Sequence, residues 1–114
     1  IMQRGPVMAD VFISYAHEDQ AFARRLAQAL EAEGVSVWWD HTIPPGKTWN
    51  TYIARGIEEA KCCIVVWSQH SVASKWVMEE ATLANDSEKL LPAAIDGSPP
   101  PMGFRSMQAA QLQN

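Results

Sequence analysis

Short apolar runs alternate along this chain with longer stretches of helical spacing. The clearest run is Cys62–Trp67, six apolar residues rich in β-branched types, which is typical of a strand buried on both faces of a parallel sheet. Pro92 weakens one of the other predicted strands or moves it to a sheet edge, because proline cannot donate to a ladder. The pattern predicts five strands, over residues 10–15, 35–39, 62–67, 90–95 and 107–112.

The first predicted helix begins near residue 20, after the turn that follows the first strand. Asp19 in that turn suits the positive end of a helix dipole. Gly34 stands where a glycine in the left-handed conformation would end the helix. The apolar centre of the predicted buried face is formed by Phe22, Leu26 and Leu30.

Two further helices are predicted, each with a polar residue that can accept from a free amide at its start. Thr48 precedes a repeat of apolar residues that extends to residue 60, and Ser74 precedes the helix over residues 75–84. Residues 41–47, with their Pro-Pro-Gly sequence, predict a loop.

Strands and helices therefore alternate, which predicts an α/β fold with a doubly wound parallel sheet. The expected architecture is flavodoxin-like, with five strands in the order 2-1-3-4-5 and helices on both faces. Residues 1–8 have no periodicity and contain Gly-Pro, so we expect a flexible lead-in followed by one domain over residues 9–114. A helix that would cover the fifth strand is expected to be missing.

Composition and charge exclude several classes of function. The 114 residues carry a formal net charge of −4, and no Lys or Arg cluster indicates a nucleic-acid-binding surface. No apolar run has the length of a membrane span, so no membrane contact is predicted. Cys62 and Cys63 are adjacent in a predicted strand and are interpreted as small core residues, which fits a reducing, cytoplasmic compartment.

Familiar cofactor and metal motifs are absent from the sequence. The first strand is followed by SYAHED instead of a glycine-rich dinucleotide fingerprint, and no P-loop is present. No zinc-type Cys/His spacing and no GxSxG nucleophile elbow occur. A receiver domain would need an Asp at the end of the third strand, where this chain has Ser68. We therefore predict no metal and no resident cofactor.

Trp76 and Glu80 are four residues apart in the third predicted helix, which follows the central strand. They share a helix face near the edge of the sheet where ligands bind in open α/β folds. An indole and a carboxylate there could hold a flat ring and its polar substituents. The alternative is core packing for Trp76 and a solvated position for Glu80.

Three stretches in this order resemble the Toll/interleukin receptor (TIR) domain family, particularly its bacterial members. They are DVFISY, then GVSVWWD with TIPPGKTW, then IVVWSQHSVASKWVMEE, and the similarity spans roughly residues 10–112. Some members of this family only assemble with other TIR domains. Others hydrolyse or cyclise NAD⁺ with a glutamate four residues after a Trp on the third helix.

The resemblance implies that this chain is an NAD⁺ nucleosidase with Glu80 as its catalytic residue, since Trp76-Val-Met-Glu-Glu80 has the family's WxxxE spacing. Glu79 matches less well, because it points about 100° away around the helix. NAD⁺ would be the substrate, and no other cofactor is implied. The products would be nicotinamide and ADP-ribose, linear or cyclised.

The resemblance also implies a set of substrate-binding residues around that glutamate. Trp76 and Tyr15 are expected to supply aromatic faces for the nicotinamide ring. The remaining candidates are Ser14, Ser68, Asp40 and Trp49. Ser14 and Ser68 end two predicted strands and are alternatively plain turn residues. Asp40 and Trp49 lie beside the loop and are alternatively a loop-capping Asp and a core Trp. Some family members carry Arg after the Tyr of the first motif, whereas this chain has Ala16.

The BB loop of the family corresponds here to a stiff, projecting segment, which is formed by Ile43, Pro44, Pro45 and Gly46. The resemblance implies that this loop docks on other TIR domains, so that self-association activates a bacterial defence or signalling protein. The alternative function is a non-enzymatic TIR–TIR interaction module. A third interpretation is a relative that acts on other nucleotides.

Overall fold

The computed structural model describes residues 9–39, 43, 45–104 and 110–111. Within these residues the strands and helices alternate along the chain, as the apolar pattern predicts. The elements are β1 (Val11–Ser14), η2 (His17–Asp19), α1 (Gln20–Ala32), β2 (Val37–Trp38), α2 (Trp49–Glu59), β3 (Cys62–Trp67), η3 (Ser71–Ala73), α3 (Lys75–Asp86), β4 (Leu90–Ala94) and β5 (Ala110–Gln111).

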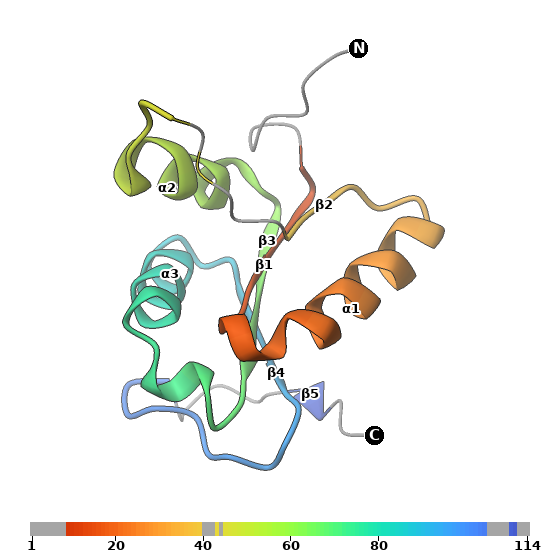
Figure 1. The fold of residues 1–114 in the computed structure, drawn as a ribbon, viewed down its shortest axis with the longest axis vertical. Coiled ribbons are helices and arrows are strands. Elements are labelled where there is room, and N and C mark those ends of the chain that lie inside the picture. The colour runs from red at the N-terminus through yellow and green to blue at the C-terminus, as the bar shows by residue number, and fades with distance from the viewer. Residues whose placement is uncertain (1–8, 40–42, 44, 105–109, 112–114) are drawn as a thin grey trace.

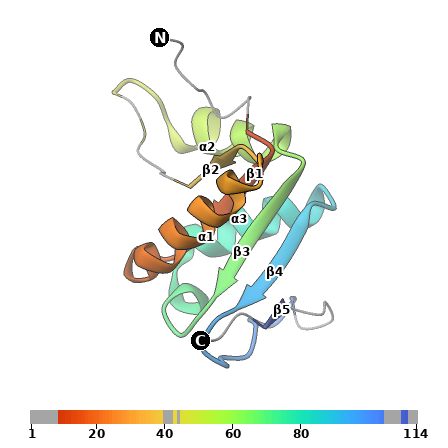
Figure 2. The ribbon, with the colours of Figure 1, turned by 90° about the vertical axis from the view of Figure 1, so that its right-hand side faces the viewer.

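All strand pairs are parallel, and the order in the sheet is β2-β1-β3-β4-β5 (Figure 2). The predicted α/β class and the order of the first four strands are therefore confirmed. Of the predicted fifth strand over residues 107–112, the structure describes Ala110 and Gln111, which pair with Ala93 and Ala94; the other residues of that prediction lie outside the described residues. Pro92 lies in β4 before this pairing begins, opposite Val65 of β3, so the side of β4 away from β3 makes no ladder there among the described residues.

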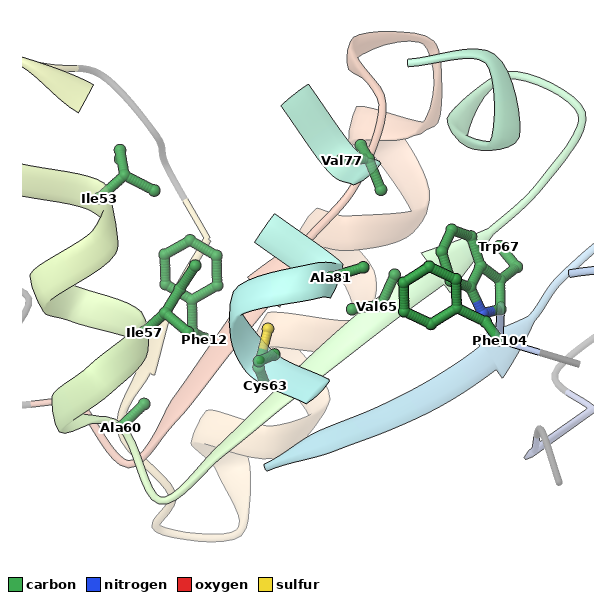
Figure 3. Close-up of a cluster of buried hydrophobic side chains, with 11 residues drawn as sticks. Phe12, Ile53, Ile57, Ala60, Cys63, Val65, Trp67, Val77, Ala81 and Phe104 are labelled. Carbon is green, nitrogen blue, oxygen red and sulfur yellow. The ribbon is translucent and has the colours of Figure 1, made fainter. Parts of the chain in front are cut away.

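The sheet separates two layers of helices: α1 packs on one face, and α2 and α3 pack on the other (Figure 1). Successive residues of β1 and β3 point to opposite faces, so each strand supplies both clusters of buried side chains. Figure 3 shows the cluster on the α2/α3 face, where Trp67 and Phe104 pack at one end with ring centroids 5.3 Å apart.

Local signals at the helix ends are mostly as predicted. Thr48 forms a reciprocal capping box with Thr51, and the Ser74 hydroxyl accepts from the Val77 amide at 3.3 Å. Gly34 follows α1 with φ +87°, which an L side chain rarely adopts.

Two details of α1 differ from expectation. The fully buried residues of the helix are Ala23 and Ala27, and the larger Phe22, Leu26 and Leu30 lie half-buried at the flanks. Small residues at the centre let the helix approach the sheet closely. Asp19, the residue before the helix, makes no side-chain capping bond, because its carboxylate contacts another loop.

Candidate functional site

Glu80 and Ser14 form the central polar contact of the candidate site. The Ser14 hydroxyl donates to Oε1 of Glu80 at 2.6 Å, although the two residues are 66 positions apart in the sequence. Both residues are buried: Ser14 is 0% exposed and Glu80 is 4% exposed. Because the alternation of β1 directs Ser14 toward α3, the hydroxyl meets the carboxylate inside the α2/α3 layer.

Cys63 of β3 lies in the same layer, and its charge state depends on the carboxylate. Burial raises the pKa of the Cys63 thiol well above its ordinary value, and the negative charge of Glu80 raises it further. The thiol is therefore neutral near neutral pH. Glu80 accordingly sits beside a neutral sulfur and a hydroxyl donor.

Glu79 lies on a different side of α3, as the helical geometry predicts. It is exposed, and with Met78 and Leu83 it lines an open groove of about 510 Å³ between α2 and α3. Glu80 does not line this groove. The two adjacent glutamates thus have different environments: one is solvated, and the other is buried and hydrogen-bonded.

Ser68, which follows β3, anchors a second polar network near the carboxyl ends of the strands. Its hydroxyl donates to Oδ2 of Asp19 at 2.5 Å and accepts from the amides of His70 and Ser71, each at 3.1 Å. The Ser71 hydroxyl in turn accepts from the Ser68 amide at 2.8 Å. The bond between Ser68 and Asp19 joins the segment after β1 to the loop that leads into α3. Sequence reasoning missed Asp19 as its partner, because nothing local links residues 49 positions apart.

The two aromatic candidates lie apart from each other. Trp76, at the start of α3, is 56% exposed. Tyr15 packs against the buried cluster on the α1 face, and its ring centroid lies 6.4 Å from that of Trp39. The guanidinium carbon Cζ of Arg24 in α1 lies over the Trp39 ring, 5.9 Å from its centroid. The structure therefore brings Ser14 and Glu80 together, while Tyr15 lies on the opposite face of the sheet.

Three candidates at the loop before α2 have limited description. Asp40 and Pro44 lie outside the described residues, and Trp49 is the first residue of α2. The other members of the predicted BB loop are exposed: Ile43, Pro45 and Gly46.

Among the described residues, no three His, Cys, Asp or Glu side chains gather in a metal-binding arrangement. The longest described helix has 13 residues, and none of the described helices could cross a bilayer.

The chain is similar in sequence to proteins that are named as enzymes acting on NAD⁺ or making cyclic ADP-ribose. The chain is 38% identical over 73 residues to the NAD(+) hydrolase PdTIR of Paracoccus denitrificans, an alignment that covers 62% of this chain and 24% of the relative. It is 37% identical over 73 residues to the 2′ cyclic ADP-D-ribose synthase AbTIR of Acinetobacter baumannii, covering 62% and 27%. The chain thus spans about a quarter of the length of these relatives.

The fold also matches solved structures. The TIR domain of the Toll-related receptor TRR-2 from Hydra magnipapillata superposes with a TM-score of 0.84 at 22% identity, covering 91% of this chain and 84% of that one. The family model described as TIR domain matches residues 11–114. The strand order, the helical layers and this match agree, and the chain belongs to the TIR domain family.

Proposed function

We propose that this domain is an NAD⁺ nucleosidase in which Glu80 is the catalytic residue. The observation that carries the proposal is a buried carboxylate, fixed by a hydroxyl at 2.6 Å, at the family's WxxxE position on α3. Two relatives with more than a third of their aligned residues identical are named as an NAD(+) hydrolase and a cyclic ADP-ribose synthase, which supports the same substrate for this chain.

The reaction needs few protein groups. Water and NAD⁺ give nicotinamide, ADP-ribose and a proton: the bond between the anomeric carbon and the pyridinium nitrogen breaks, and its electron pair leaves with nicotinamide. The leaving group is neutral, so no general acid is required. The Glu80 carboxylate would offset the positive charge that develops on the ribose in an oxocarbenium-like transition state. In the cyclised product, a hydroxyl of the same molecule replaces water as the nucleophile.

The remaining candidates have different supporting geometry. The indole of Trp76, one helical turn before Glu80, is 56% exposed, which supports its stacking on the pyridinium ring. Tyr15 would reach substrate only from the other face of β1, at the strand end. The Ser68 hydroxyl already donates to Asp19, which favours its turn role over substrate binding. Asp40 and Trp49 stay predictions from the resemblance, as borders of the pocket.

Self-association is part of this proposal. Glu80 is only 4% exposed, so substrate reaches the carboxylate only after some of its cover moves. Docking of a neighbouring domain through the exposed BB loop residues Ile43, Pro45 and Gly46 would supply such a movement and complete the site. The free thiols of Cys62 and Cys63 fit a reducing, cytoplasmic compartment.

The test is NAD⁺ consumption by the domain, concentrated or tethered on a surface, with nicotinamide release followed by chromatography. Glu80→Gln keeps the shape of the side chain and removes its charge, and we expect a loss of at least about 100-fold in rate. Glu79→Gln is the matched control, because it removes the adjacent, exposed charge from the same helix. We expect the control to retain wild-type activity within about twofold. Activity that persists in Glu80→Gln would refute the site assignment.

A non-enzymatic interaction module is the second candidate function. The observation that favours it is the exposure of large apolar side chains: Ile43 at 36%, Trp76 at 56% and Met102 at 83%. If the clustered domain leaves NAD⁺ intact, sedimentation and pull-down with TIR domains would test this alternative. A domain that neither associates nor cleaves NAD⁺ would contradict both functions.

A further inference from the structure

Ser14 is placed to control the geometry of the Glu80 carboxylate. The family resemblance implies that Ser14 binds substrate, and in the structure its hydroxyl donates to Oε1 of Glu80. Ser14 is fully buried in β1, which pairs with β2 on one side and β3 on the other. The donor is therefore held by a central strand of the sheet.

A glutamate side chain needs such an anchor to act precisely. It has three rotatable bonds, and its terminal torsion has a broad energy profile, so packing alone leaves the plane of the carboxylate poorly defined. Glu80 also belongs to a helix, whereas Ser14 belongs to the sheet that the helix covers. The 2.6 Å contact ties these two layers together at the reacting group.

We propose that Ser14 is a positioning residue that orients the Glu80 carboxylate toward the positive charge that develops on the ribose as the nicotinamide–ribose bond breaks. The inference rests on the proposed function, because it assigns a role within that reaction. Ser14 does not touch the substrate in this proposal: its hydroxyl fixes one carboxylate oxygen and so sets the orientation of the carboxylate plane. A misplacement of about 1 Å at a reacting group can cost about 100-fold in rate, which sets the scale of the expected effect.

The neighbours of Glu80 simplify the pH dependence that such a role predicts. Cys63 of β3 is a titratable side chain whose pKa burial and the Glu80 charge both raise, so the thiol stays neutral through the acidic and neutral range. Ser14 of β1 does not titrate. A hydrogen bond to an ionised carboxylate favours the ionised form, so its removal moves the acid limb of the rate profile toward higher pH.

The experiment compares Ser14→Ala with Ser14→Thr, which keeps a hydroxyl, in steady-state NAD⁺ cleavage between about pH 5 and pH 9. We expect Ser14→Ala to lower kcat by about 10- to 100-fold, to change KM by less than about threefold, and to move the acid limb to higher pH. Ser14→Thr should return the acid limb to the wild-type position.

Ser71→Ala is the matched control, since Ser71 is also fully buried and hydrogen-bonded but contacts Ser68. It should destabilise the domain without moving the acid limb. If Ser14→Ala keeps wild-type kcat and acid limb while Glu80→Gln is inactive, the positioning role is overturned and the proposed function stands. If the unaltered domain does not cleave NAD⁺, both are overturned. An acid limb in Ser14→Thr that matches Ser14→Ala also overturns the role.

Discussion

Replacing Ser68 with alanine separates a structural hydroxyl from a substrate-binding one. The hydroxyl donates to Asp19 and accepts from two backbone amides, those of His70 and Ser71. Ser68 itself is only 1% exposed. If this network is its role, Ser68→Ala lowers the free energy of unfolding and leaves the KM for NAD⁺ unchanged.

The structure sets the size of the effect. Ser68→Ala leaves the buried Ser71 amide without this acceptor, and an unsatisfied buried group costs about 1–3 kcal/mol. His70 is exposed, so its amide can bond to water instead and adds little. The loss of the bond to Asp19 adds less, because that carboxylate is partly solvated. We expect a total of about 2–4 kcal/mol for Ser68→Ala. Asp19→Ala removes only the acceptor of the Ser68 hydroxyl and leaves both amide bonds intact, so it should cost about 1 kcal/mol.

Urea unfolding followed by tryptophan fluorescence measures both variants, with the midpoint compared at constant m value. Gln69→Ala is the control, since its side chain is exposed in the same loop, and it should change stability by less than about 0.5 kcal/mol. The reasoning is refuted if Ser68→Ala behaves like this control, or if Asp19→Ala costs as much as Ser68→Ala.

Two further predictions concern titratable groups. Cys62 is half-buried and Cys63 is fully buried, and burial raises the pKa of both thiols, more strongly for Cys63. Iodoacetamide should therefore alkylate Cys62 first in the native domain. Equal alkylation rates of the two thiols by mass spectrometry would contradict the packing of β3. The backbone amides of Gln69 and Ser98 lower the pKa of Asp96 from its ordinary 3.8, so its stabilising contribution is fully present above that value and is lost as pH falls through the lower folded value. Asp96→Asn should therefore lose its stability difference from wild type in strong acid; a difference that grows below pH 3.8 would show the opposite sign.

Local patterns predicted the elements because each rests on neighbouring residues. The apolar run Cys62–Trp67 forms β3 with the predicted bounds, and Ser74 caps α3 as its hydroxyl suggests. β2 is shorter than predicted: only Val37 and Trp38 pair with β1, although β1 itself continues to Ser14 beside β3. Fold class follows from the sequence; strand ends depend on tertiary pairing.

The candidate site is less accessible from sequence. Helical spacing separates Glu80 from Glu79, and the family motif singles out Glu80. However, the bonds from Ser14 to Glu80 and from Ser68 to Asp19 join residues 66 and 49 positions apart. Such contacts arise from the arrangement of strands and loops, so no local pattern encodes them.

The alternation of β1 limits how this segment can change in evolution. Ser14 faces α3 and Tyr15 faces the α1 layer, although they are consecutive in the chain. A single-residue insertion or deletion within Val11–Ser14 would exchange these two directions and turn the Ser14 hydroxyl away from Glu80. Substitutions that preserve size can be accommodated along this strand one at a time, whereas changes in its length cannot. The spacing of the first motif is thus under a stricter constraint than most of its individual residues.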